Sequence, residues 1–183
     1  TDPIDRLEIQ YGTSFIYPVS SVGSHVSASP NHQTGRVTSL KTRAAAATAG
    51  TFAYELDLNK LSEEEKDEIR GQIREYKKYA RLVQQGLYYR LTNPQTADTG
   101  AWEFVSEDGK EALVQAVTIR QHANMDVSYI KLRGLAENTV YREEESGRTY
   151  NSTALMEAGI PVPVELGEYR AYQWHFVQEE QGE

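Results

Sequence analysis

Two histidines and a serine are the side chains best placed by type and spacing for polar chemistry. His25 and Ser27 lie in a Val- and Ser-rich run at residues 19–29, and His32 follows in a polar loop at 30–36. Residues two apart in an extended strand share one face, so His25 and Ser27 form one polar row. There they could bind a hydroxylated ligand or hold a carboxylate; the alternative is that both are buried polar groups paired within the fold.

Metal binding and cysteine chemistry find little support in the composition. The chain contains no Cys, which excludes a thiolate metal site, a cysteine nucleophile and a disulfide framework, and its four His leave few ligands for zinc. The acidic run Glu63, Glu64 and Glu65 fits the first turn of a helix, where carboxylates favour the helix dipole and remain solvated. We therefore expect no metal site and no cofactor.

The net charge of the chain bears on whether it binds nucleic acid. Among 183 residues, 19 Lys and Arg face 27 Asp and Glu, giving a net charge of -8. This is the wrong sign for a protein that gains affinity by neutralising phosphates, so we expect no nucleic acid partner. No apolar run approaches the roughly 18 residues of a membrane span, and residues 1–4 do not begin a signal peptide. These features predict a cytoplasmic protein with no membrane contact.

Up to residue 86, the elements that must position these side chains alternate between helix and strand. Asp2 before Pro3 is typical of a helix start, and Ser62 with Glu65 forms a capping box. The pattern predicts a helix from Pro3, strands over 19–29 and 51–58, and helices over 39–49 and 62–85. Gly86 is expected to end the last helix in the left-handed conformation. This order is typical of a parallel sheet with helical crossovers, but two strands are too few for a complete one.

After residue 86 the period changes to two. Strands are predicted over 87–92, 101–106, 111–120, 127–133, 139–143 and 170–178, with a hairpin turn at Asp108 and Gly109. The whole acidic excess lies in this half, since residues 1–86 carry 11 basic and 11 acidic side chains and residues 87–183 carry 8 and 16. The predicted fold class is α/β followed by all-β, with a domain boundary near Gly86 and a second domain resembling a β-sandwich.

Several motifs resemble glycoside hydrolase family 36, the bacterial α-galactosidases. They are IQYGTS at residues 9–14, GSHVS at 23–27, PNHQTGR at 30–36, YYRL at 88–91 and LRGL at 132–135. The resemblance implies that residues 1–86 are the last strands and helices of a (β/α)8 catalytic barrel and that residues 87–183 are the C-terminal antiparallel β-sandwich domain. Strand 19–29 would then be strand seven of the barrel. His25, Ser27 and His32 would lie at its C-terminal end, where barrel enzymes bind substrate.

The resemblance also implies the chemistry. Family members are retaining α-galactosidases that need no cofactor and act on terminal α-galactosyl units of melibiose or raffinose-type oligosaccharides. Their nucleophile lies in a Lys-x-Asp motif and their acid/base in a Trp-x-Ser-Asp motif, and neither motif occurs in this sequence. Because a retaining glycosidase needs two carboxyl groups about 5 Å apart, we expect the chain to be inactive alone and its parent, a homo-oligomer, to be active.

Two further expectations concern surfaces. With an incomplete barrel, Val22, Val26, Ile69 and Ile73 would form an exposed apolar patch and promote association. The alternative function, of a different class, is a non-catalytic carbohydrate-binding or assembly module on the second domain, in which Trp102 and Trp174 would stack on a sugar. Aromatic side chains in such strands more commonly fill a core.

Overall fold

The computed structural model describes residues 1–179; residues 180–183, the end of the predicted second domain, lie outside the described part. The first half contains α1 (Pro3–Thr13), η1 (Val19–Ser21), β1 (Gly23–Ser27), α2 (Leu40–Thr48), β2 (Thr51–Glu55), η2 (Leu58–Lys60) and α3 (Glu63–Gln85). β1 and β2 pair in parallel, from Gly23 opposite Thr51 to Ser27 opposite Glu55. The predicted alternation of helices and strands is confirmed, although both strands are shorter than predicted.

Helix α3 begins as predicted and ends differently. The capping box is complete, because the Ser62 hydroxyl accepts from the Glu65 amide and the Glu65 carboxylate accepts from the Ser62 amide. The predicted left-handed conformation of Gly86 is wrong, since its φ is -72° and its ψ is 167°. Glycine is needed there for space: a Cβ would lie 2.4 Å from the Leu82 carbonyl oxygen and 2.9 Å from that of Val105.

Helices α2 and α3 cover one face of the β1–β2 pair. Val26 is fully buried and packs with Leu40 and Ala47 of α2 and with Ile69 of α3. The predicted exposed patch at Val26 and Ile69 is therefore wrong. The small side chains of the Ala-rich helix let it approach β1 closely and exclude water from both residues.

The second half is built around one antiparallel sheet. Its elements are β3 (Leu87–Arg90), β4 (Thr99–Val105), β5 (Glu111–Thr118), β6 (Tyr129–Ile130), β7 (Val140–Glu143), β8 (Thr149–Asn151), α4 (Ser152–Glu157), β9 (Ile160–Pro161) and β10 (Ala171–Gln178). Six strands form the sheet in the order β3-β4-β5-β10-β7-β8, and β6 pairs separately with β9. The antiparallel fold predicted for this half is confirmed, as is the β4–β5 hairpin, in which Gly109 has a φ of 72°. The predicted strand 127–133 is reduced to β6.

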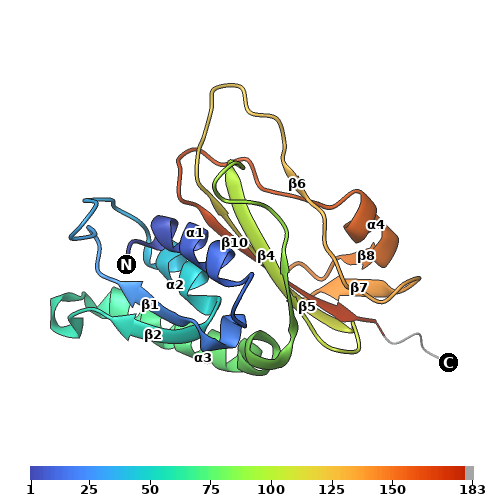
Figure 1. Cartoon of the computed structure of the whole chain (residues 1–183), viewed down its shortest axis with the longest axis horizontal. Helices are drawn as coiled ribbons and strands as arrows, with labels where there is room; N and C mark the ends of the chain where they lie inside the picture. The colour runs from blue at the N-terminus through green and yellow to red at the C-terminus, as the bar shows by residue number, and fades with distance from the viewer. Residues whose placement is uncertain (180–183) are drawn as a thin grey trace.

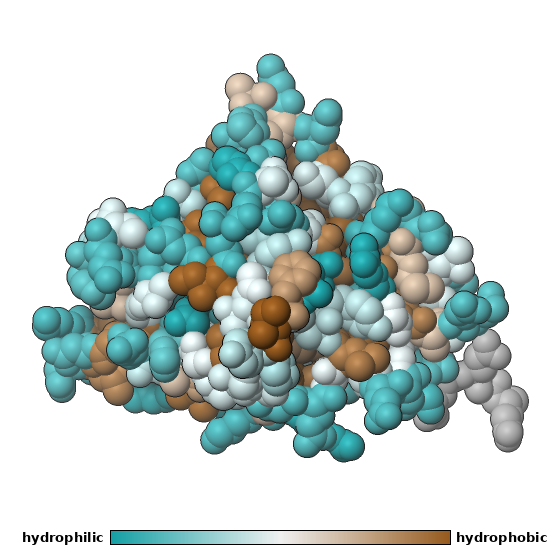
Figure 2. All heavy atoms as spheres, viewed as in Figure 1, coloured by the Kyte–Doolittle hydropathy of each residue, from teal (hydrophilic) through white to brown (hydrophobic). Residues whose placement is uncertain are grey.

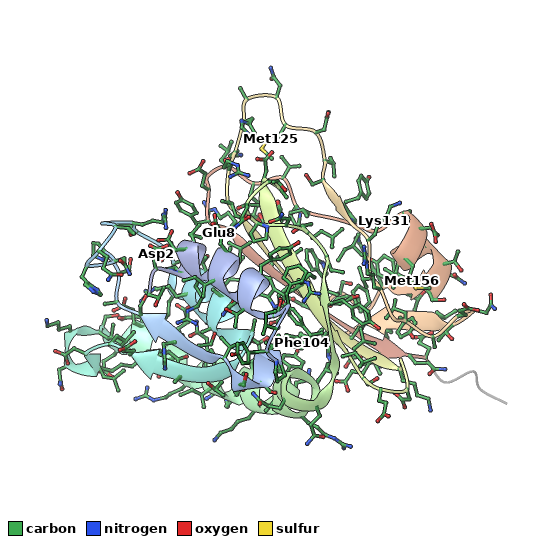
Figure 3. The ribbon with its side chains drawn as sticks, in the orientation of Figure 1. Asp2, Glu8, Phe104, Met125, Lys131 and Met156 are labelled. Carbon is green, nitrogen blue, oxygen red and sulfur yellow. The ribbon has the colours of Figure 1, made fainter. Side chains whose placement is uncertain are left out.

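The six-stranded sheet lies between the helices of the first half and the segments around β6 and α4 (Figure 1). A hydrophobic core lies on each side of it. On one face, Phe104 and Leu113 pack against residues of α1 and α3, including Leu7 and Leu82. Figure 3 shows Phe104 between the helices and the sheet. The second face is covered by β6, β9, α4 and the residues that directly follow the two strands, and the core residues of this cover are Ile130, Leu132, Leu155, Ile160 and Val162. The helices of the first half and the sheet of the second therefore share one core.

Apolar side chains remain at the surface where α1 ends. Ile9 is 52%, Phe15 59% and Ile16 77% exposed. In the space-filling view, brown hydrophobic atoms reach the surface in this part of the molecule among mostly polar neighbours (Figure 2). Exposed large apolar side chains that lie close together are typical of a surface that contacts another part of a protein.

Candidate functional site

The predicted polar row lies on the face of the β1–β2 pair that is turned away from α2 and α3. Val26 points to the helices, so the alternate residues His25 and Ser27 point to the opposite side. Their opposite neighbours on β2 are Ala53 and Glu55, which share this face. His25 Nδ1 lies 3.8 Å from Glu55 Oε2. Glu55 was missed in the sequence, because its position beside His25 depends on the register of two strands.

Ser27 is the most enclosed residue of this row. It is 7% exposed, and its hydroxyl has no hydrogen-bond partner among the described residues. Its carbonyl oxygen accepts a hydrogen bond of 2.7 Å from the buried guanidinium of Arg43 on α2. Buried hydroxyl groups are normally paired, so the Ser27 hydroxyl is a group with unused bonding capacity at the C-terminal end of β1.

The loop after β1 is shaped by Asn31. The Asn31 side-chain oxygen accepts from the amides of Gln33 and Thr34, at 2.9 and 3.2 Å, and the Asn31 amide donates to the Arg36 carbonyl. His32 lies at the exposed tip of this turn. Within residues 1–179 it forms no hydrogen bond or ion pair, so the structure places it on the loop without joining it to His25 or Ser27.

Asp2 ties this loop to the start of α1 (Figure 3). Only 1% exposed, it caps α1 by accepting from the amides of Ile4 and Asp5. Its other oxygen accepts from the Thr34 hydroxyl at 2.8 Å, and Arg36 forms an ion pair with it. Burial acts to raise the pKa of Asp2, but these hydrogen bonds and the Arg36 charge outweigh it and hold that pKa below its usual 3.8. Asp2 is therefore ionised near neutral pH.

A second polar contact fixes α1 to β1. The Arg6 guanidinium donates to the Gly23 carbonyl at 2.7 Å, and the Gln10 amide donates to the Ser24 hydroxyl at 2.6 Å and to the Ala46 carbonyl at 2.8 Å. Arg6, Gln10 and Ser24 are all buried. Buried polar groups that are paired in this way specify one arrangement of α1, β1 and α2.

The described residues hold no group of three or more His, Asp or Glu side chains arranged to bind a metal ion. In the same part of the chain, we find no helix that combines the length and the apolar character of a membrane span.

The two tryptophans lie in the core and at its margin. Trp102 is 5% exposed, and its indole nitrogen donates to the Gln115 side chain at 3.0 Å. Trp174 is partly buried and stacks on Tyr172, with ring centroids 6.1 Å apart. Trp102 therefore cannot offer its ring to a sugar at the surface.

Comparison with known proteins gives the chain its family. Residues 1–86 match the melibiase family model, and residues 99–176 match the model of the glycosyl hydrolase family 36 C-terminal domain. The chain belongs to glycoside hydrolase family 36. The resemblance predicted from the GSHVS and PNHQTGR motifs is thereby confirmed, and the chain corresponds to the C-terminal part of a family 36 α-galactosidase.

Two curated members of family 36 illustrate the relationship. The bifunctional α-galactosidase/sucrose kinase AgaSK of Mediterraneibacter gnavus is 55% identical over 97% of this chain, and the α-galactosidase AgaA of Geobacillus stearothermophilus is 47% identical over 95%. The chain spans only 19% and 24% of their respective lengths.

Solved family 36 structures share the fold described above. The galactosidase domain of AgaSK matches with a TM-score of 0.95 and 55% identity, covering 98% of this chain and 25% of that domain. An AgaA variant solved in complex with raffinose matches with a TM-score of 0.94 and 45% identity, over the same shares of each chain. Another AgaA variant was solved with stachyose.

Proposed function

We propose that this chain is the C-terminal part of a longer retaining α-galactosidase that hydrolyses terminal α-galactosyl units of raffinose-type oligosaccharides. The observation that carries the proposal is the continuous match, over 98% of the chain and at a TM-score of 0.94, to an α-galactosidase solved with raffinose. Eight curated relatives with 35 to 55% identity carry α-galactosidase in their names, which supports it.

In this proposal both catalytic carboxylates come from other strands of the barrel. Double displacement requires one carboxylate to attack the anomeric carbon and a second carboxyl group, about 5 Å away, to protonate the leaving oxygen. On the polar face of β1 and β2, Glu55 is the one carboxylate of the described strands, and it is paired with His25. A single acid cannot perform both roles, so we expect the chain alone to be inactive.

The polar row has a supporting role in this proposal. His25 and Ser27 would donate to or accept from sugar hydroxyls, or would hold a neighbouring strand's catalytic carboxylate in place. The unpaired hydroxyl of Ser27 and the exposed edge of His25 support this assignment. His32 would contact substrate or a neighbouring subunit from the loop tip, held in position by Asn31.

The open surfaces of the first half also fit a partial barrel. β1 and β2 pair with each other and, among the described residues, with no other strand, and Ile9, Phe15 and Ile16 are exposed at the end of α1. In the parent, the preceding strands and helices would cover these groups. The boundary near Gly86 and the homo-oligomeric state of the parent belong to the same proposal.

Hydrolysis of p-nitrophenyl α-galactoside tests the proposal. We expect no turnover by residues 1–183 and clear turnover by a version extended upstream through the whole barrel. In the extended enzyme, His25→Ala should lower kcat/KM about 100-fold if His25 positions substrate or a catalytic group. His122→Ala is the matched control, because His122 lies in the second half. Turnover by the short chain would contradict the division of catalytic groups.

A further inference from the structure

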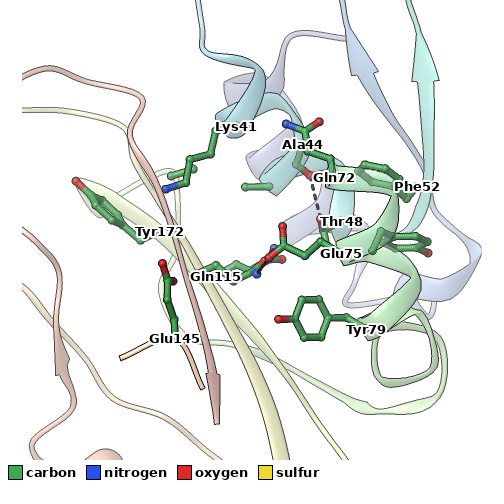
Figure 4. Close-up of a pocket in the computed structure, with 14 residues that line it drawn as sticks. Lys41, Ala44, Thr48, Phe52, Gln72, Glu75, Tyr79, Gln115, Glu145 and Tyr172 are labelled. Carbon is green, nitrogen blue, oxygen red and sulfur yellow. Dashed lines mark hydrogen bonds between the residues drawn. The ribbon is translucent and has the colours of Figure 1, made fainter. Parts of the chain in front are cut away.

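A cavity lies at the junction between the helices and the sheet (Figure 4). Its volume is about 220 Å³, and it is lined by α2, α3, the beginning of β10 and Glu145 from the turn after β7. This is far more than the roughly 15 Å³ that one water needs and less than the roughly 300 Å³ at which drug-sized sites begin. The space is that of a small molecule of about one six-membered ring.

A chain of hydrogen bonds forms the polar wall of the cavity. The Trp102 indole donates to Gln115 at 3.0 Å, Gln115 donates to Gln173 at 2.8 Å, and Gln173 donates to Glu75 Oε1 at 2.7 Å. Each side chain in this series donates a hydrogen bond to the next one, so each is held in one orientation. One proton on each amide and the second oxygen of Glu75 remain for a ligand.

Three further polar groups around the cavity lack partners. Tyr79 is 6% exposed, and within residues 1–179 its hydroxyl forms no hydrogen bond. Burial and nearby carboxylates raise the pKa of Tyr79 to about 12, so the hydroxyl stays a donor. Lys41 from α2 and Glu145 from the turn after β7 also line the cavity (Figure 4). Neither forms an ion pair with a described residue.

Two aromatic side chains, Phe52 and Tyr76, also line the cavity. Phe52 and Tyr76 stack with ring centroids 4.7 Å apart and planes at 19°. Flat apolar rings beside amide and carboxylate side chains suit a pyranose, which has a C–H face and a rim of hydroxyls that both donate and accept. One Lys facing two Glu disfavours an anionic ligand.

We propose that this junction cavity binds one neutral hexopyranose unit. Its hydroxyls are held by Glu75, Gln173, Lys41 and Glu145, and its C–H face lies against an outer face of the stacked Phe52–Tyr76 pair. The binding is a second sugar-recognition function and does not rest on the proposed hydrolysis. With a few hydrogen bonds in an open cavity, the expected Kd is about 1 mM.

The indole signal of Trp102 reports occupancy. The chain has two tryptophans, and Trp102 is joined to the cavity wall through Gln115. In ¹H–¹⁵N NMR spectra of the full chain, galactose or glucose up to about 100 mM, a hundred times the expected Kd, should shift that signal saturably. An absent or linear shift overturns the proposal. Sorbitol, an open-chain polyol, should produce no saturable shift.

Two variants locate the bound sugar. Lys41→Ala and Glu145→Ala should each weaken binding about tenfold, because each removes one charged hydrogen bond to a hydroxyl. Both side chains are exposed at the rim, so the fold is preserved. The matched controls are Lys131→Ala and Glu137→Ala, which remove exposed charges outside the cavity and should leave binding unchanged. Equal binding by all five proteins would place the sugar elsewhere and overturn the assignment.

The test of sugar binding can fail or succeed independently of the test of galactoside hydrolysis. In the extended enzyme, Lys41→Ala should leave turnover of p-nitrophenyl α-galactoside unchanged while weakening the sugar-dependent shift. Failure of the extended enzyme to hydrolyse galactosides would reject the hydrolytic function and leave the NMR result standing.

Discussion

At the scale of single residues, the ion pair between Asp2 and Arg36 joins two segments that are 34 positions apart. Asp2 is almost fully enclosed, whereas Arg36 is partly exposed. Removing one member of a buried ion pair leaves the other charge, or its hydrogen-bond donors, without a partner. The resulting loss of stability exceeds the net contribution of the intact pair. The fold of the loop at 30–36 therefore depends on the charge of Asp2.

Replacing Asp2 by Asn tests this dependence. Asn still caps a helix but lacks the charge, so we expect the free energy of unfolding to fall by about 1–3 kcal/mol at pH 7. The folded-state pKa of Asp2 lies below 3.8, so its contribution is present above that pH and is lost as the pH falls through the folded value. Urea unfolding of both proteins at pH 7 and pH 3 should show the gap closing. Asp67→Asn, an exposed partner of Arg70, should cost under about 1 kcal/mol.

Glu103 is a carboxyl group buried in the core of the sheet. It is fully enclosed; one oxygen accepts from the Arg133 amide and the other has no partner among the described residues. Burial raises the pKa of Glu103 to about 8, an effect that the hydrogen bond and charge of Arg133 offset only in part. The group is therefore mostly protonated at neutral pH.

The raised pKa predicts a loss of stability at alkaline pH. The stabilising contribution of protonated Glu103 is fully present below about pH 4.5. It is lost as the pH rises through about 8, because the folded chain must then hold a buried charge. Glu103→Gln removes the titration and keeps an acceptor for Arg133. Guanidinium unfolding at pH 5 and pH 9 should show the variant gaining on the wild type by roughly a few kcal/mol. A pH-independent difference would contradict this, and exposed Glu107→Gln is the control.

The sequence revealed local contacts at this scale and missed distant ones. Asp2 was recognised as a helix cap because its partners are two and three residues away. Its bonds to Thr34 and Arg36, and the contact of His25 with Glu55, depend on how the loop and strands lie in space. No period or propensity encodes those distances, so these contacts of the candidate site could not be predicted.

At the scale of elements, the end of α3 is set by space. A Cβ on Gly86 would meet two backbone oxygens, at 2.4 and 2.9 Å, and backbone cannot move aside as a side chain can. In the middle of the same helix, a Cβ on Gly71 would have the tip of Arg74 at 3.9 Å as its nearest neighbour.

These two glycines make a matched pair of substitutions. Gly86→Ala should lower the free energy of unfolding by about 1–3 kcal/mol through overpacking. Gly71→Ala should raise it by roughly 0.5–1 kcal/mol, because alanine restricts the unfolded chain and favours the helix. Thermal unfolding of both variants measures the two signs. Equal effects would mean that backbone flexibility, and not space, is what Gly86 provides.

Long elements with clear caps were predictable, and short ones were not. The 23 residues of α3 carry a capping box and a continuous apolar stripe. β6, β9 and α4 have two, two and six residues, too few for a period to stand out, and they exist because the sheet needs a cover. Tertiary packing decides such elements.

At the scale of the whole molecule, the two halves are joined by one core. Phe104 is fully buried in a cluster that includes Leu7, Tyr79 and Leu82 from the helices. The domain boundary near Gly86 stays a prediction; the hydrophobic cluster around Phe104 contains residues from both sides of it. We therefore expect the whole chain to unfold in one cooperative transition.

Truncating Phe104 tests this cooperativity. Phe104→Ala should cost about 3–5 kcal/mol and lower protection from hydrogen exchange in β1 as well as in β5. Exchange that increases in the sheet alone would show that the halves are energetically independent. Val127→Ala, at an exposed site, should change neither.

The shared core also constrains how such proteins diversify. Ala46 of α2 and Ala49, the residue that caps the end of α2, are nearly fully enclosed in the same cluster as Phe104 and Trp102 of the sheet. A gain of volume on one side must therefore be matched by a loss on the other. Residues at these positions should covary among homologous enzymes. Chimeras that exchange residues 87–183 between distant homologues should therefore fold poorly unless the facing alanines are exchanged with them.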